Sequence, residues 1–303
     1  MRIVSLLPSA TEIVFALGLG DQLEGVTYEC DFPSEARSKP VVCETALPQD
    51  RPLSAREIDD FVSSSMDRQE PIYLLDKDVI QKVQPDLILA QDLCRVCAVP
   101  SGQVEEALSE LGCTSDVLSL DPQTIDDILE GILLVGRATG TGELAGEIVA
   151  GLRDRVARVR SGASGLPSIR TLCLAWSDPP FVAGHWIPGM VELAGGSNLL
   201  NPPNQPSRKI PWREIAEAAP ELVVFMPCGY YLDEAETEGE RLFEVGDFAE
   251  TPAARLGNVF VVDATSYFSR PGPRIVDGLE ILAWVIHPEA FPEPPPDRVN
   301  KIR

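Results

Sequence analysis

The chain has 303 residues, of which 44% are hydrophobic, and its formal net charge is −22 at pH 7. This length lies at the upper limit for a single hydrophobic core, so we expect two domains. The acidity excludes the basic surface that nucleic-acid binding requires. The sequence contains no run of about 18 apolar residues, so it predicts no membrane-spanning helix. The seven cysteines, an odd number scattered along the chain, are typical of a reducing compartment rather than of a disulfide framework.

The first residues do not have the pattern of a signal peptide. Arg2 is followed directly by IVSLLP, which is too short for the apolar core of such a segment. The sequence as written therefore predicts a cytoplasmic protein, or a periplasmic or extracellular one whose leader has been removed. We expect a monomer.

Strands and helices alternate along the first half of the chain. Residues 2–7 predict a strand, and the next helix is expected to begin at Ser9, which has the spacing of a capping box with Glu12. The Pro-rich stretch 39–53 is expected to be irregular. Further strands are predicted at 23–27, 86–90 and 115–120, and further helices at 54–63, 75–83, 104–111 and 124–139.

Residues 141–160, TGELAGEIVAGLRDRVARVR, predict one long helix. Glutamates lie early in it and arginines late, which suits the helix dipole at both ends. About twenty residues at ~1.5 Å each would make a rod of about 30 Å. Its apolar side chains recur at three- and four-residue steps and form one stripe: Leu144, Ile148, Leu152, Val156 and Val159.

After this helix the pattern starts again. The strand 170–176 corresponds to 2–7, and the sequence Pro220-Glu-Leu-Val-Val-Phe corresponds to Pro85-Asp-Leu-Ile-Leu-Ala. The other elements of the second copy are predicted helices at 187–194, 212–219 and 273–285 and a strand at 258–263.

Two copies of a strand–helix–strand pattern predict an α/β fold with mainly parallel sheets and helices on both faces. In such sheets ligands bind beyond the carboxyl ends of the strands. The predicted organisation is an N-terminal α/β lobe at 1–139, a connecting backbone helix at 140–162, a C-terminal α/β lobe at 163–290 and a Pro-rich surface tail at 291–303.

Five segments in order carry a family resemblance: RIVSLLPSATEIVFALGLGDQLEGVTYECDFP, QKVQPDLILAQD, DPPFVAGHWIPGMVELAGGSNLL, PWREIAEAAPELVVFMPCG and TSYFSRPGPRIVDGLEIL. Together they resemble the BtuF-like periplasmic vitamin B12 (cobalamin)-binding proteins, which are helical-backbone (class III) substrate-binding proteins of metal-chelate ABC transporters. The resemblance spans residues 2–285 and includes the long helix. It implies two Rossmann-like lobes joined by one rigid backbone helix, with the ligand in the cleft between them.

The resemblance implies a binding protein without enzymatic activity and without a required cofactor. The expected ligand is a corrinoid or a related metal chelate, bound for an ABC-type uptake system or by a cytosolic relative of one. Binding of haem or a siderophore is a further alternative. The family docks its permease through an acidic residue on each lobe; Glu214 matches on the second lobe, whereas no glutamate stands at the corresponding first-lobe position near Ser101.

Carried over residue by residue, the resemblance places ligand contacts in the loops that follow the strands. A corrin is wide, flat and largely apolar, so aromatic side chains suit it, although each aromatic residue could instead belong to the core, Trp176 most of all. Asp92 and Asp178 have the alternative role of caps, and Arg270 that of a surface salt bridge. The expected ligand-binding residues are Tyr28, Glu29, Cys30, Asp31, Phe32, Gln91, Asp92, Cys94, Trp176, Asp178, Phe181, His185, Trp186, Cys228, Gly229, Tyr230, Phe268 and Arg270.

Sulfur is prominent in these loops, because Cys94-Arg-Val-Cys97 directly follows a predicted strand. Such a pair is half a metal site, a dithiol redox pair, or chance. In one hypothesis, His185 or a thiolate is an axial ligand to the cobalt of a corrinoid. In another, the protein is a cytosolic metal- or iron–sulfur-cluster-binding or dithiol redox protein. The candidate ligands are Cys30, Cys94, Cys97, His185 and Cys228, and the alternative is that the cysteines are small fillers.

Overall fold

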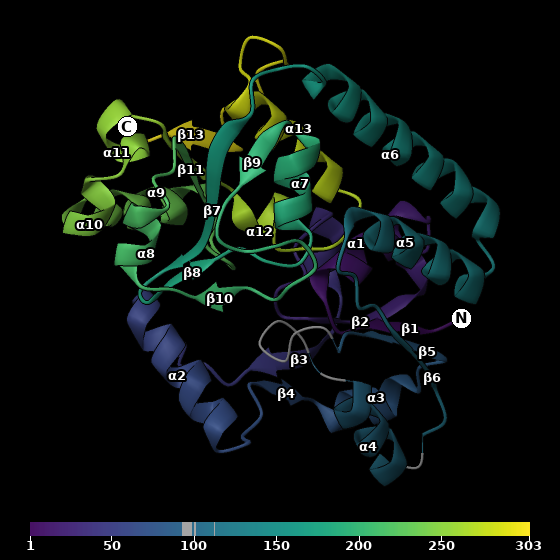
Figure 1. Ribbon diagram of the computed structural model, residues 1–303. Coiled ribbons are helices and arrows are strands. Elements are labelled where there is room, and N and C mark those ends of the chain that lie inside the picture. Colours follow the sequence, from purple (N-terminus) through teal and green to yellow (C-terminus); the bar gives the residue numbers. More distant parts are fainter. Residues whose placement is uncertain (93–98, 100, 112) are drawn as a thin grey trace. The chain divides into compact units, whose positions relative to one another are not determined.

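The computed structural model describes residues 1–92, 99, 101–111 and 113–303, and Figure 1 labels its helices and strands. The chain divides into two compact units. The first lobe comprises Met1–Pro122 and Asp127–Val149, and the second lobe comprises Gln123–Asp126 and Ala150–Arg303. Each lobe has its own sheet, so the predicted α/β class with two sheet-containing lobes is confirmed.

The first lobe contains a six-stranded sheet in the order β4-β3-β2-β1-β5-β6. All its pairings are parallel except that of β3 with β4. Parallel pairing brings the carboxyl ends of five strands to one edge, where the loops with candidate ligand residues begin. The strands are β1 (Ile3–Ser5), β2 (Leu23–Thr27), β3 (Val41–Thr45), β4 (Tyr73–Leu75), β5 (Leu87–Ala90) and β6 (Asp116–Ser119).

The helices of the first lobe differ from the prediction mainly at their starts. Helix α1 begins at Pro8, with Leu7 as the N-cap and no side-chain cap, so the predicted capping box at Ser9 is wrong. Proline fits the first helical position because it has no N–H to satisfy. The helices are α1 (Pro8–Ala16), α2 (Ala55–Asp67), α3 (Lys77–Val83), α4 (Ser101–Leu111) and α5 (Ile125–Thr139), with short 3₁₀ turns η1 (Gly20–Gln22) and η2 (Ser34–Ser38).

The stretch 39–53 is not irregular throughout, because it contains β3. Val42 and Cys43 are fully buried there, and Val41 pairs with Val26 of β2. The flanking prolines concealed a strand of five residues. The predicted capping of α2 by Ser54 is confirmed, since Ser54 and Glu57 form a reciprocal capping box.

The second lobe contains a seven-stranded sheet in the order β10-β8-β7-β11-β12-β13, with β9 paired to β7. Strands β9, β7, β11 and β12 are parallel to their neighbours among these four, whereas β8, β10 and β13 pair antiparallel. The strands are β7 (Ile169–Ser177), β8 (Pro180–Val182), β9 (Gly196–Asn198), β10 (Arg208–Lys209), β11 (Leu222–Phe225), β12 (Val259–Val262) and β13 (Val299–Lys301). The Pro-rich tail, expected on the surface, thus ends in an edge strand that the prediction did not include.

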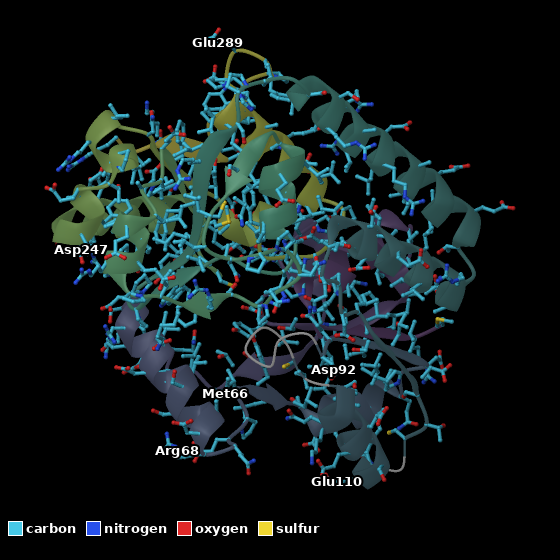
Figure 2. The ribbon with its side chains drawn as sticks, viewed as in Figure 1. Met66, Arg68, Asp92, Glu110, Asp247 and Glu289 are labelled. Carbon is cyan, nitrogen blue, oxygen red and sulfur yellow. The ribbon has the colours of Figure 1, made fainter. Side chains whose placement is uncertain are left out.

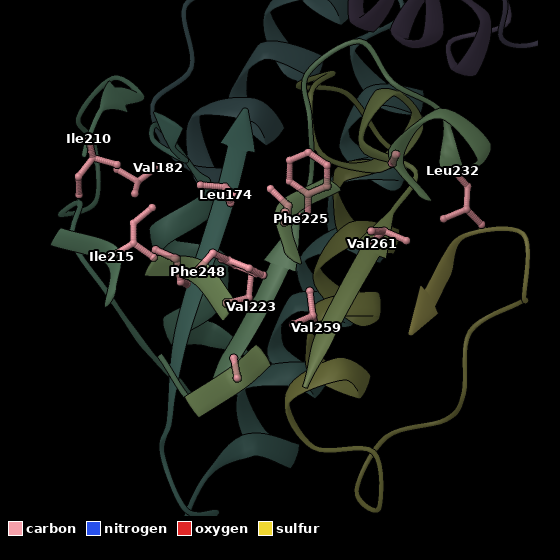
Figure 3. Close-up of a cluster of buried hydrophobic side chains, with 14 residues drawn as sticks. Leu174, Val182, Ile210, Ile215, Val223, Phe225, Leu232, Phe248, Val259 and Val261 are labelled. Atoms are coloured by element: carbon pink, nitrogen blue, oxygen red, sulfur yellow. The ribbon is translucent and has the colours of Figure 1, made fainter. Parts of the chain in front are cut away.

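The core of the second lobe lies where β7, β11 and β12 meet the helices that follow them (Figure 3). Val223 and Phe225 of β11 are fully buried together with Phe248 of α10. The helices and 3₁₀ turn are α6 (Gly142–Ala163), α7 (Ile187–Leu193), α8 (Trp212–Glu217), α9 (Leu232–Arg241), η3 (Leu242–Glu244), α10 (Gly246–Ala249), α11 (Pro252–Leu256), α12 (Ala264–Tyr267) and α13 (Ile275–Ile286). No helix in the described part of the chain is both long and apolar enough to cross a bilayer.

The predicted internal repeat is confirmed in the pairing of the strands. The order β1-β5-β6 in the first lobe corresponds to β7-β11-β12 in the second. The two copies also share a contact: the amide of Arg2 donates to Asp86 Oδ2 at 2.7 Å, and the amide of Arg170 donates to Glu221 Oε2 at 3.0 Å. Each acidic residue follows the proline that precedes the second strand of its copy.

Helix α6 is one continuous helix of 22 residues, as predicted, and the division between the lobes runs through it. In the first lobe it packs closely on α5, because a Cβ added at Gly136 would lie 2.5 Å from Ala145 Cβ. In the second lobe Arg155 donates to Glu280 Oε2 and Asp277 Oδ1 of α13, each at 2.6 Å. The Arg155 side chain is only 27% exposed, so these contacts are partly shielded from water.

We expect Arg155→Met to lower the free energy of unfolding of the second lobe by about 1–3 kcal/mol, because it removes the cation shared by Glu280 and Asp277 and leaves only the longer contact of Asp277 with Arg298, at 4.0 Å. Chemical denaturation followed by circular dichroism measures the loss. Arg213→Met is the matched control, since Arg213 forms an exposed pair with Glu217 within α8 and should leave the midpoint unchanged. Equal effects of the two substitutions would contradict the assignment.

Acidic side chains cover much of the surface, and Figure 2 shows Glu110, Asp247 and Glu289 pointing outward from the ribbon. With 47 Asp and Glu against 25 Lys and Arg, the folded protein carries strong self-repulsion. Added salt screens this repulsion over a Debye length that falls from about 10 Å at 0.1 M to about 3 Å at 1 M.

The thermal midpoint is therefore expected to rise when NaCl is increased from about 0.1 M to 1 M. Differential scanning calorimetry at constant pH measures it. A parallel series in sucrose separates charge screening from preferential exclusion. If the thermal midpoint falls or stays level in NaCl, the stabilisation lost from screened ion pairs is at least as large as the stabilisation gained by screening the net repulsion.

Candidate functional site

The candidate residues of the first lobe lie in loops at the carboxyl edge of its sheet. Residues 28–33 leave β2, and Phe32 is 45% exposed in this loop. Tyr28 is half-buried, and burial raises the pKa of its phenol, which therefore stays neutral at pH 7. The Glu29 amide donates to the Thr27 hydroxyl at 3.4 Å, the Cys30 amide donates to the Thr27 carbonyl at 3.0 Å, and Asp31 forms an ion pair with Arg37.

Cys30 points into the first lobe. The residue is 4% exposed, and its Sγ lies 3.0 Å from Thr11 Oγ1 of α1. This environment fits a small buried filler, because a metal-binding thiolate is favoured by nearby positive charge and access. Its role as a ligand remains a prediction.

Asp92 joins the ends of three elements. Its carboxylate accepts hydrogen bonds from the Ser101 amide at 2.8 Å and from the hydroxyls of Ser101 and Ser119 at 2.5 and 3.0 Å. Its own amide donates to Asp121 Oδ1. Asp92 thus performs the capping role that the sequence left open, at the start of α4, while the preceding Gln91 is buried. Cys94 and Cys97 lie outside the described residues.

The corresponding edge of the second lobe carries an aromatic group. The rings of Trp176 and Tyr230 meet edge to face, with centroids 5.4 Å apart and an interplanar angle of 72°. Phe181 of β8 lies opposite Trp176 in the register, and the Lys209 ammonium lies 5.5 Å from the Phe181 ring centroid. Trp176, Tyr230 and Phe181 are all half-buried. Burial raises the pKa of Tyr230 to about 12, so its phenol is neutral. We call these three residues the aromatic surface.

A buried carboxylate forms a hydrogen bond with the residue that follows Trp176. Glu238 of α9 is 8% exposed and accepts a hydrogen bond of 2.6 Å from Ser177 Oγ, the residue that follows Trp176. Arg241 donates to the other oxygen of Glu238 at 2.9 Å. Asp178 comes next, in the turn between β7 and β8. Sequence reasoning missed Glu238, because nothing in the sequence indicates that α9 returns to the end of β7.

His185 is held in an uncommon backbone conformation, with φ = +53°. Its amide donates to the Gln205 carbonyl at 2.6 Å, and its carbonyl accepts from the Asn204 amide at 3.2 Å. The ring lies against Trp186, with centroids 5.7 Å apart, and its Nδ1 is 3.3 Å from Gln123 Oε1. Burial lowers the pKa of His185 below 6.5, which leaves the imidazole neutral at pH 7. Such a conformation in a non-glycine residue is often found at functional sites.

Three predicted residues lie deeper than expected for ligand contacts. Trp186 and Phe268 are 7% and 2% exposed, and the Trp186 indole donates to the Phe268 carbonyl at 3.0 Å. Their burial fits the core alternative. Arg270 is 7% exposed, so the alternative of a surface salt bridge is wrong.

Cys228 and Gly229 form the turn before Tyr230. Cys228 is exposed, and Gly229 has φ = +83°, which favours glycine. Among the described residues, no three His, Cys, Asp or Glu side chains come together as a metal-ion site. The direct metal or cluster hypothesis depends on Cys94 and Cys97 and stays a prediction.

Glu214, the predicted permease-docking residue, forms an ion pair with Arg208 at 3.0 Å, and both side chains are 43% exposed. The carboxylate is thus accessible but partly neutralised by a neighbour.

The periplasmic binding protein family matches residues 3–265 of the chain. The chain belongs to this family. A cobalamin-binding protein of Halobacterium salinarum is 26% identical over 292 residues, covering 94% of this chain and 69% of that protein.

Two solved structures share the fold. The periplasmic vitamin B12 binding protein BtuF of Vibrio cholerae superposes with a TM-score of 0.69 at 22% identity, covering 94% of this chain and 96% of the other. A periplasmic heme binding protein from Pseudomonas aeruginosa gives a TM-score of 0.72 at 22% identity, covering 98% and 96%. The resemblance to class III substrate-binding proteins is therefore confirmed. Members of the family are the substrate-binding components of ABC transporters, and these components are not themselves enzymes.

Gly184, which precedes His185, lies against the backbone of residues 205–207. A Cβ at Gly184 would lie 2.3 Å from Ser207 N and 2.4 Å from Gln205 O. We expect Gly184→Ala to destabilise the second lobe by about 2–4 kcal/mol, because backbone atoms cannot yield as a flexible side chain does. Thermal denaturation measures the effect.

Gly189→Ala is the control, since no atom lies within 4 Å of its added Cβ. Within α7 this substitution should be neutral or stabilise by about 0.5–1 kcal/mol. A stable Gly184→Ala protein would show that the 203–207 segment can move away.

Proposed function

We propose that this protein binds a flat metal chelate, a corrinoid first of all, as the substrate-binding component of an ABC-type uptake system that acts outside the cytoplasm. The observation that carries the proposal is the aromatic surface of Trp176, Phe181 and Tyr230 in the second lobe, together with the neutral imidazole of His185 in the segment that follows β8. Aromatic rings give rigid, apolar contact area to a wide macrocycle. The family and the relatives named above, which bind cobalamin or haem, support the same ligand class.

In this proposal the second lobe supplies a stacking surface and a metal ligand. The aromatic surface contacts the macrocycle, and His185 offers its imidazole to the metal of the chelate, since imidazole suits cobalt and iron. Within the first lobe, Phe32 is the most exposed aromatic side chain of the loop 28–33. Haem is the second candidate ligand, because an imidazole also suits its iron.

Titration of the purified protein with aquocobalamin, cyanocobalamin and haemin tests the proposal by visible spectroscopy and calorimetry. A dissociation constant in the micromolar range or below is expected for at least one corrinoid. If the protein binds haemin but neither cobalamin, haem replaces the corrinoid as the proposed ligand. No affinity below the millimolar range for any of the three would refute the proposal.

Trp176→Leu and Tyr230→Ala should each weaken binding about 5- to 30-fold, since an aromatic contact of this kind contributes about 1–2 kcal/mol. Trp284→Leu is the matched control. Trp284 is also a half-buried tryptophan in an edge-to-face pair, with Phe260 at 6.1 Å, but it lies on α13. Equal losses in Trp176→Leu and Trp284→Leu would indicate a folding effect rather than a lost contact.

A further inference from the structure

Gln123 contacts the ring of His185 although 62 residues separate them. Gln123 precedes α5 and belongs to the four-residue segment Gln123–Asp126 that groups with the second lobe. Its Oε1 lies 3.3 Å from His185 Nδ1. An amide carbonyl oxygen only accepts hydrogen bonds, so this contact is a hydrogen bond in the tautomer that carries its proton on Nδ1, in which Nε2 of the neutral ring holds a lone pair.

The remaining contacts of His185 fix its backbone and one face of its ring. The backbone is held on both sides by the 204–205 segment, and the ring face lies against Trp186. A histidine that binds a metal usually donates its other ring N–H to a carbonyl or carboxylate, which sets the tautomer and makes the ligand more basic. Gln123 occupies that position before any metal is bound.

The geometry points to Gln123 as a positioning residue that keeps His185 in the Nδ1–H tautomer, so that Nε2 can displace an exchangeable ligand from the metal of the bound chelate. This inference rests on the proposed function. In the exchange a metal–water bond breaks, a metal–Nε2 bond forms and the water leaves, with no change in oxidation state.

Such an arrangement selects among chelates. It favours those whose metal has an exchangeable axial position, such as aquocobalamin or haemin. It gives no advantage to a chelate whose axial position is held by cyanide, or to a siderophore that already surrounds its iron. The aromatic surface, by contrast, does not distinguish these axial states.

The tautomer can be measured without any ligand. The chain has only two histidines, His185 and His287, so long-range ¹H–¹⁵N correlation spectra of the labelled protein contain two imidazoles, and His185→Ala assigns them. The wild-type protein should show His185 with Nδ1 protonated. Gln123→Leu should shift it toward the Nε2–H form, whereas Gln123→Glu, which keeps an acceptor oxygen, should retain the Nδ1–H form. An Nε2–H form in the wild-type protein would overturn the inference.

The second readout uses aquocobalamin and cyanocobalamin as probes. Gln123→Leu should weaken aquocobalamin binding about tenfold and reduce the spectral shift caused by imidazole coordination, while binding of cyanocobalamin stays the same. Gln205→Leu is the control, because Gln205 contacts His185 only through its backbone carbonyl. An unchanged aquocobalamin affinity and spectrum in Gln123→Leu would overturn the inference. Failure of both cobalamins and of haemin to bind would instead refute the proposed function, and the tautomer measurement would still stand.

Discussion

The unbroken backbone hydrogen bonding of α6 is the constraint on which the organisation of the chain depends. The helix belongs to the first lobe up to Val149 and to the second lobe from Ala150. Its first turns pack on α5 so closely that Gly136 has no room for a side chain. Its later turns are held to α13 through Arg155. Each lobe thus holds its own part of α6 through packed contacts.

The parallel strands position the candidate binding residues. Each sheet collects loops at its carboxyl edge. In the second lobe Ser177 meets the buried Glu238, and His185 meets Gln123 at a partly buried contact. The Ser177–Glu238 hydrogen bond thus holds the end of β7 directly next to Trp176, as a rigid binding surface requires.

The fold could be predicted from the sequence because the two copies repeat both their order of strands and helices and the residues at the boundaries of these elements. Proline followed by an acidic residue precedes β5 and β11, and the arginine before β1 and at the start of β7 bonds to that acidic residue in both lobes. Strand β3 and the helices between Leu232 and Leu256 were missed, because prolines and a dense run of charges masked their short apolar patterns. At the candidate site, the aromatic residues could be named from the resemblance. The burial of Cys30 and Arg270 and the contacts of Gln123 and Glu238 could not, because they depend on how distant segments fold together.

The pairing of β13 with β12 has a consequence for how the second lobe is made. Val262 and Phe260 find their partners in Val299 and Lys301, so one edge of the sheet stays open until those residues have been synthesised. Until then β12 presents unpaired backbone groups that can recruit another chain. A chain that emerges from the ribosome therefore cannot complete this lobe early. The open edge of β12 is closed only when the last residues of the chain fold back on it.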